Sequence, residues 1–105
     1  MSWFFLILAG LLETGWAVGL KAIAEKPNIA IIAVTTFFLV ASMACLTLAM
    51  RNLPLGISYP VWTGIGSVGS IIFGVLVFNE NLQLGNIAGA GLIILGILLV
   101  ALNSH

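Results

Sequence analysis

Charged side chains are scarce in this sequence. Its 105 residues include three basic and three acidic side chains, which make up 6% of the chain, whereas 62% of the residues are hydrophobic. Soluble globular domains carry about 25% charged residues. So little charge excludes an ordinary soluble domain, and we predict an integral membrane protein that contacts the lipid bilayer along most of its length.

Cysteine and the motifs of enzymes are also scarce. A single cysteine, Cys45, excludes an internal disulfide, and we expect it to act as a small buried hydrophobic residue. The sequence has no cluster of metal ligands, no nucleophile paired with a base and no room for a nucleotide-binding module. Residues 64–69 read GIGSVG, but this dinucleotide-binding pattern has no meaning inside an apolar run. We therefore predict no cofactor, no metal, no nucleic-acid partner and no enzyme activity.

Long apolar runs are what the sequence does contain. They cover residues of about 3–21, 29–50, 55–78 and 85–103. Each run is close to the roughly 20 residues with which an α-helix crosses about 30 Å of hydrocarbon. The predicted fold is all-α, with four transmembrane helices in a single domain over residues 1–105. Between the first two runs we expect a loop, AIAEKPN, in which Pro27 ends helical character and Asn28 caps the next helix.

Glu13 is the one charged residue inside these runs, near the middle of the first. A charge at that depth is costly unless it faces a cavity or a partner, so by default it marks a site that handles ions or substrates. Small residues share its helical face, and Trp16 lies about one turn away, which favours a pocket. Two other interpretations are weaker. A contact that joins helices needs a polar partner, and the other runs contain no cation; a cleaved signal peptide would begin with a basic segment.

Polar residues also lie within the second and third runs. Ser42 is near the middle of the second, and taken alone we expect it to bond to a carbonyl of its own helix. Polar, aromatic and small residues share one face of the third run: Tyr59, Trp62, Thr63, Gly66 and Ser70. Trp62 is about 10 Å inside the run, deep for a residue of the interfacial aromatic belt. Pro60 and several glycines loosen this helix, and interrupted helices with polar faces are typical of transporter sites and hinges.

The fourth run has no ionisable residue but has a stripe of glycines. Gly85, Gly89 and Gly96 share one face, and the first two form a GxxxG pair. We interpret this stripe as a dimer seam, although packing within one subunit could use the same glycines.

The charges of the loops hardly favour either orientation of the chain in the membrane. Lys21 and Lys26 flank the first loop and Arg51 the second, so two basic residues lie on one side of the membrane and one on the other. A chain with so small a difference can insert both ways up. Glu80, in the third loop, is expected to be a solvated surface charge.

These residues together resemble a known family. Gly10, Glu13 and Trp16, followed by Ser42 and by YPVWTGIG from Tyr59 to Gly66, are similar to the pattern of the small multidrug resistance family. Within that family, the chain resembles the guanidinium exporter branch. The first loop and Pro60 depart from the exporter pattern, which has Ala in place of this proline.

The resemblance implies a fold, an activity and a set of site residues. It implies an antiparallel, dual-topology homodimer in the bacterial inner membrane, which exchanges protons for small organic cations. Glu13 would be the shared proton and substrate site. The other roles implied are hydrogen bonding nearby for Ser42 and Trp62, a polar gate for Tyr59, pocket walls for Gly10 and Trp16, a hinge for Gly64 and Gly66, and dimerisation for the fourth run.

The substrate predicted is guanidinium and related small guanidinyl cations. A planar guanidinium can make paired hydrogen bonds with a carboxylate and stack on tryptophan, whereas a quaternary ammonium has no donors and needs a wider aromatic cage. Three alternatives stay open at this point. They are a multidrug exporter of quaternary ammonium and hydrophobic cations, one subunit of a heterodimeric transporter, and, least favoured, a membrane assembly protein that transports nothing.

Overall fold

Four α-helices make up most of the protein. The computed structural model describes residues 2–103. The helices are α1 (Ser2–Glu25), α2 (Ile29–Met50), α3 (Leu55–Phe78) and α4 (Leu84–Leu102). All four are long and apolar enough to cross a membrane. The prediction of an all-α protein with four membrane-spanning helices is therefore confirmed.

The first loop is shorter than expected. Helix α1 continues past Lys21 to Glu25, so the prediction of a loop over residues 22–28 is wrong for its first half. The added turn consists of residues that favour a helix, and Lys21 pairs with Glu25 at 3.7 Å between Nζ and Oε2. The rest of the loop is as expected, because Asn28 caps α2 by accepting a hydrogen bond from the Ala30 N–H at 2.7 Å.

The third helix is continuous. Helix α3 runs without a break through Pro60, so the expectation of an interrupted span is wrong. Pro60 lies early in the helix, and within residues 2–103 no glycine has a positive φ angle. The Thr63 hydroxyl donates to the Tyr59 carbonyl at 3.0 Å and to the Pro60 carbonyl at 3.2 Å. A bend at the glycines of α3 therefore stays a prediction.

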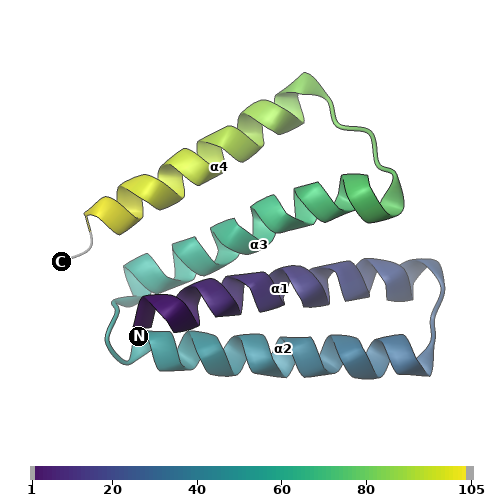
Figure 1. The fold of residues 1–105 in the computed structure, drawn as a ribbon, viewed down its shortest axis with the longest axis horizontal. Helices are drawn as coiled ribbons and strands as arrows, with labels where there is room; N and C mark the ends of the chain where they lie inside the picture. The colour runs from purple at the N-terminus through teal and green to yellow at the C-terminus, as the bar shows by residue number, and fades with distance from the viewer. Residues whose placement is uncertain (1, 104–105) are drawn as a thin grey trace.

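The helices lie side by side in a single layer. Figure 1 shows the spatial order α4, α3, α1, α2, with α1 and α3 running in the same direction and α2 antiparallel to both. Helix α1 packs against α2 and α3, whereas α4 packs against α3 alone among the described helices. The molecule extends over 44 × 34 × 16 Å, and its short dimension is less than two helix diameters of about 10–12 Å.

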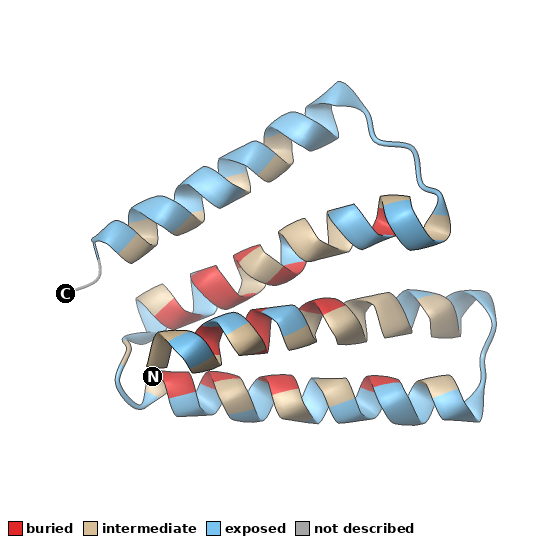
Figure 2. Cartoon of the chain, viewed as in Figure 1, coloured by how far each residue is buried: buried red, intermediate tan, exposed pale blue. Residues whose placement is uncertain are grey.

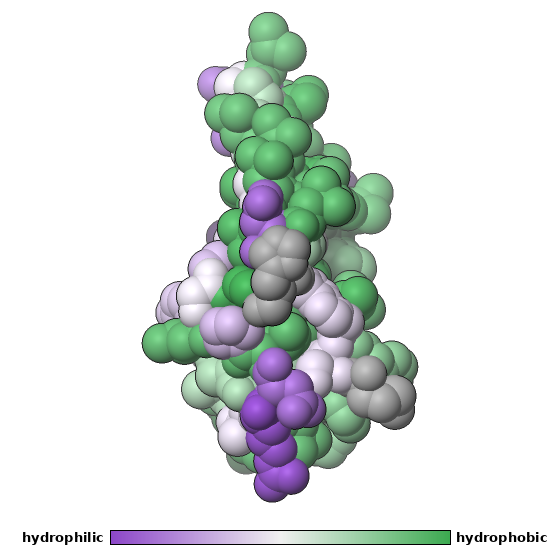
Figure 3. All heavy atoms as spheres, turned by 90° about the vertical axis from the view of Figure 1, so that its left-hand side faces the viewer, coloured by the Kyte–Doolittle hydropathy of each residue, from purple (hydrophilic) through white to green (hydrophobic). Residues whose placement is uncertain are grey.

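Buried residues gather at one end of this layer. The core consists of Leu6, Ala9, Leu46, Ala49, Val61 and Trp62, from the first halves of α1 and α3 and the second half of α2. In Figure 2 the buried segments lie mainly toward the end where α2 leads into α3, and α4 has none; none of the residues 84–102 is buried. Figure 3 looks at that end and shows mostly hydrophobic side chains, with hydrophilic ones in small patches. Such an exposed apolar surface suits lipid or another apolar partner.

Candidate functional site

Glu13 lies in the contact between α1 and α3. Its carboxyl group sits directly against Gly66, because a Cβ built on Gly66 would collide with Glu13 Oε1. The absence of a side chain at this position of α3 is therefore what gives the acid its place between the two helices. Glu13 and Gly66 were predicted separately, as binding site and hinge, and the structure brings them together.

Two further close contacts hold α1 and α3 in the same register. A Cβ on Gly10 of α1 would come within 2.7 Å of Ile65, and one on Gly69 of α3 would collide with the Thr14 hydroxyl. Thr14 is buried, and its hydroxyl donates to the Gly10 carbonyl at 3.2 Å. The pairing of Thr14 with Gly69 was not predicted, although the spacing of three between Gly66 and Gly69 places both glycines on the face that meets α1.

Two polar atoms on the Glu13 face have no partner. Among residues 2–103, three buried side-chain atoms make no hydrogen bond, and they include Glu13 Oε1 and Trp16 Nε1. Buried polar groups in proteins are normally paired, so an exception needs a specific explanation. Both atoms are covered by the subunit itself, so a ligand or a partner chain can pair with them only after a local rearrangement.

A hydrogen-bonded cluster lies one turn before the acid. The Ser42 hydroxyl donates to the Ala9 carbonyl at 2.8 Å, and the Trp62 indole N–H donates to Ser42 Oγ at 3.0 Å and to Ala9 O at 3.2 Å. The expectation that Ser42 bonds to its own helix is wrong, because its hydroxyl reaches α1 instead. Ser42 and Trp62 therefore tie α1, α2 and α3 together close to Glu13, and no hydrogen bond between described residues joins either of them to the carboxylate.

Tyr59 and Trp62 form an aromatic pair at the start of α3. Their ring centroids are 5.5 Å apart with an angle of 56° between the planes. Trp62 is 5% exposed and Tyr59 51%, so the pair runs from the core to the surface. The roles of Tyr59 as a pocket residue and as a gate stay predictions.

The predicted hinge and seam glycines differ in their surroundings. Gly64 is buried, and a Cβ there would come within 2.5 Å of Ile97 of α4. By contrast, Gly85, Gly89 and Gly96 have open space where a side chain would be. Within the described residues, these three glycines therefore do not form close helix contacts inside the subunit, which was the alternative to a dimer seam.

Other sequence features have plainer roles. Cys45 is partly buried and packs against the core, as expected of a small hydrophobic residue. Within residues 2–103 there is no group of three or more side chains that could hold a metal ion.

Four apolar helices, with the partly buried Glu13 between α1 and α3, define a multi-pass membrane protein. The chain belongs to the small multidrug resistance family, since residues 1–93 match the model of the Small Multidrug Resistance protein family. It is a multi-pass protein of the bacterial inner membrane.

Similar proteins carry a common name. The chain is 43% identical over 105 residues to a protein named "Guanidinium exporter" from Escherichia coli strain K12, and the match covers 100% of both chains. Proteins of the same name from Salmonella typhimurium strain LT2 and from Citrobacter freundii are 43% and 42% identical, again over 100% of both chains.

Proposed function

We propose that this chain is a proton-coupled exporter of guanidinium and related small guanidinyl cations, with Glu13 as the site for both proton and cation. Full-length relatives named as guanidinium exporters support a small-cation exporter. The observation that carries the finer proposal is the Glu13 carboxyl group, held against Gly66 with Oε1 buried and unpaired.

The chemistry of the site suits a guanidinium ion. The carboxylate offers two acceptor oxygens to the planar fork of donors that guanidinium presents, and such paired, charge-assisted bonds are strong. Trp16 lies one turn away on α1, and Trp62 is held on the neighbouring face of α3 by Ser42 and Ala9. Aromatic faces near a carboxylate favour a flat cation.

Exchange follows from competition for one negative charge. A single carboxylate binds either a proton or a cation, and in both cases the site becomes neutral. If the protein switches its access from one side of the membrane to the other only when the site is occupied, inward proton flow drives cations outward. The chain itself then needs no nucleotide or cofactor.

We further propose that the transporter is an antiparallel homodimer. Alternating access commonly uses two inverted repeats, and one chain of four spans has no second repeat, whereas two copies of opposite orientation provide it. A layer 16 Å thick suits a second copy, and so do the glycines of α4, which have open space where a side chain would be. The small difference in loop charge suits both orientations.

The exporter activity is tested by uptake into proteoliposomes. With an acidic interior, outward proton flow should drive accumulation of guanidinium, and a proton uncoupler should abolish it. Tetra-alkylammonium ions lack N–H donors and should be transported at least about tenfold more slowly. Fast transport of bulky quaternary ammonium without guanidinium would instead identify a multidrug exporter, and uptake that ignores the proton gradient would contradict the coupling.

The dual orientation is tested by labelling loops from one side. In a Cys45→Ala background, the exposed loop residues are replaced one at a time, as Asn52→Cys in the second loop and Asn81→Cys in the third. A membrane-impermeant maleimide applied to spheroplasts should label about half of each variant, the rest reacting after permeabilisation. A chain of single orientation would give full labelling of one variant and none of the other, as a subunit of an obligate heterodimer would.

A further inference from the structure

A second carboxylate, outside the Glu13 site, is folded back onto α3. Asn79 ends α3 in the left-handed conformation, with φ at 54°, and the Glu80 N–H then donates to the Gly74 carbonyl at 3.1 Å. This turn returns the Glu80 side chain along the helix, where its carboxylate rests on Gly74; a Cβ on Gly74 would collide with Oε1. Glu80 is exposed, as expected, but its carboxylate is docked against the protein rather than free in solvent.

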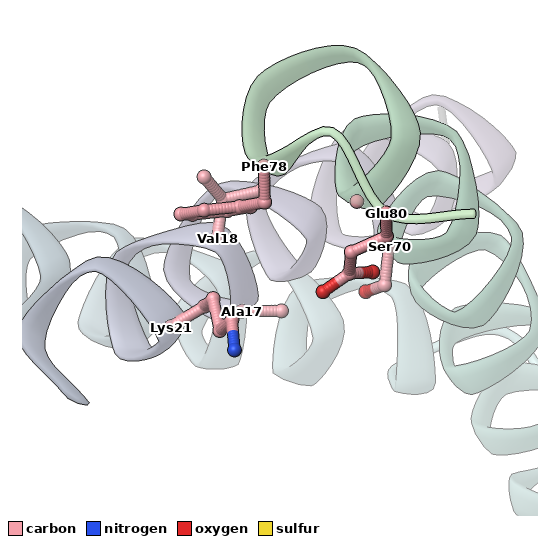
Figure 4. Close-up of a pocket in the computed structure, with 7 residues that line it drawn as sticks. Ala17, Val18, Lys21, Ser70, Phe78 and Glu80 are labelled. Carbon is pink, nitrogen blue, oxygen red and sulfur yellow. The ribbon is translucent and has the colours of Figure 1, made fainter. Parts of the chain in front are cut away.

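The docked carboxylate lines a pocket between α1 and α3. The pocket has a volume of about 200 Å³, several times the roughly 30 Å³ that one water occupies in the liquid. Ala17 and Lys21 of α1 form one wall, and Ser70 of α3, Phe78 and Glu80 lie on the other sides. Figure 4 shows the Glu80 carboxylate directed toward the α1 wall and the Phe78 ring beside Val18.

This pocket is in line with Glu13. Because α1 and α3 run in the same direction, each step of four residues moves one turn along both. Glu13 meets Gly66, and the residues one turn further, Ala17 and Ser70, already line the pocket. The pocket therefore begins about 6 Å from Glu13 along the helix axis and leads toward the end of α1. Ser70 donates its hydroxyl proton to the Gly66 carbonyl at 2.7 Å, which leaves its oxygen free to accept a bond.

We propose that Glu80 is a docking site for the cation at the entrance to this pocket. A small guanidinyl cation pairs there with the Glu80 carboxylate, against the Phe78 ring, before it moves past Ser70 to Glu13. The proposal rests on the proposed function, which it extends from one carboxylate to two. Lys21 also lines the pocket, but its ammonium pairs with Glu25 at 3.7 Å and, within residues 2–103, no ion pair joins it to Glu80, so the Glu80 carboxylate is left without a cationic partner.

The test is the uptake kinetics of three variants in the same proteoliposomes. Glu80→Gln should raise the half-saturating guanidinium concentration by about threefold to tenfold at low ionic strength, with an unchanged maximal rate. The difference should shrink with added salt, since the screening length falls from about 30 Å at 0.01 M to about 8 Å at 0.15 M. Lys21→Gln, which removes the opposing charge, should lower the half-saturating concentration.

Each other outcome has a distinct meaning. An unchanged half-saturating concentration in Glu80→Gln, in vesicles that still exchange guanidinium for protons, would overturn the docking site and leave the proposed function intact. Lys21→Gln and Glu80→Gln could instead change the maximal rate alike, with the wild-type rate returning in the charge swap Lys21→Glu with Glu80→Lys. Lys21 and Glu80 would then act as an ion pair that holds the entrance closed, and the docking site would be wrong. Absence of exchange by the unmodified protein would contradict the proposed function instead.

Discussion

Glu13→Gln should abolish coupled exchange while leaving the protein folded. Glutamine has nearly the same shape as glutamic acid, so it fits against Gly66, but it cannot release a proton or neutralise a cation. Removing one partner of a buried charge pair costs about 3–5 kcal/mol, which corresponds to a loss of roughly a hundredfold to several thousandfold in affinity. We expect guanidinium uptake driven by a proton gradient to fall at least about a hundredfold.

The pH dependence of binding separates this role from a structural one. In the unmodified protein, protons and guanidinium compete, so the apparent affinity for guanidinium should fall as the pH is lowered through the range in which Glu13 takes up a proton. In Glu13→Gln the residual affinity should be independent of pH over that range. Glu25→Gln is the control for the pH dependence, because this exposed acid of the same helix lies outside the contact of Glu13 with Gly66. It should keep proton-coupled exchange and its pH dependence, and only the half-saturating concentration should rise, since Lys21 loses its partner at the entrance. Coupled exchange that survives in Glu13→Gln would mean that another group binds the proton.

Gly66→Ala should be the most damaging of the small substitutions in α3. The added methyl group would occupy the place of the Glu13 carboxyl group, so either the acid must turn away or α1 and α3 must separate. Both changes displace the carboxylate from the site, and a displacement of about 1 Å can cost a factor of about a hundred in activity. We expect proton-driven guanidinium uptake to fall at least about tenfold.

The matched control for this substitution is Gly56→Ala. Gly56 lies in the same helix, but a Cβ there has no atom within 4 Å, so the variant carries the same chemical change into open space. Since alanine favours a helix over glycine by about 1 kcal/mol, Gly56→Ala should be at least as stable as the unmodified protein and equally active. Equal activity of Gly66→Ala and Gly56→Ala would show that Glu13 does not meet Gly66 in the transporting state.

The positions of the helices were largely predictable, and their contacts were not. Four apolar runs separated by Pro27, Arg51 and Pro54, and the Asn-rich third loop, place the four spans, because length and hydropathy decide what crosses a bilayer. The end of α1 was misplaced because a lysine suggested the membrane boundary, whereas a helix in water can continue as long as its residues favour it.

The errors at the site concern bonds between helices. A serine in a helix can bond to its own carbonyl or to that of a neighbour, and Ser42 does the latter because α1 presents the Ala9 carbonyl close by. The sequence gives no means of knowing which helix lies there. The contact of Glu80 with Gly74 likewise depends on the left-handed conformation of Asn79. The sequence does not specify this conformation, because other residues and other turns can also end a helix.

The uneven distribution of the core makes the two ends of the helix layer mechanically different. The buried residues of α1, namely Leu6, Ala9, Gly10 and Thr14, all lie in its first 14 residues, near the cluster of Ser42 and Trp62. The second half of α1 has no buried residue among those described, and its close contact is with α2, where Gly19 sits against the buried Thr35. On the side of α3 the pocket lined by Ala17 and Ser70 opens instead, so the contact that clamps α1 to α3 lies at one end. Lys21 is about 18 Å from Ala9 along the axis, and a tilt of about 5° at the clamp would move it by roughly 1.5 Å. Small rearrangements at the clamped end are therefore amplified at the entrance that Lys21 and Glu80 share.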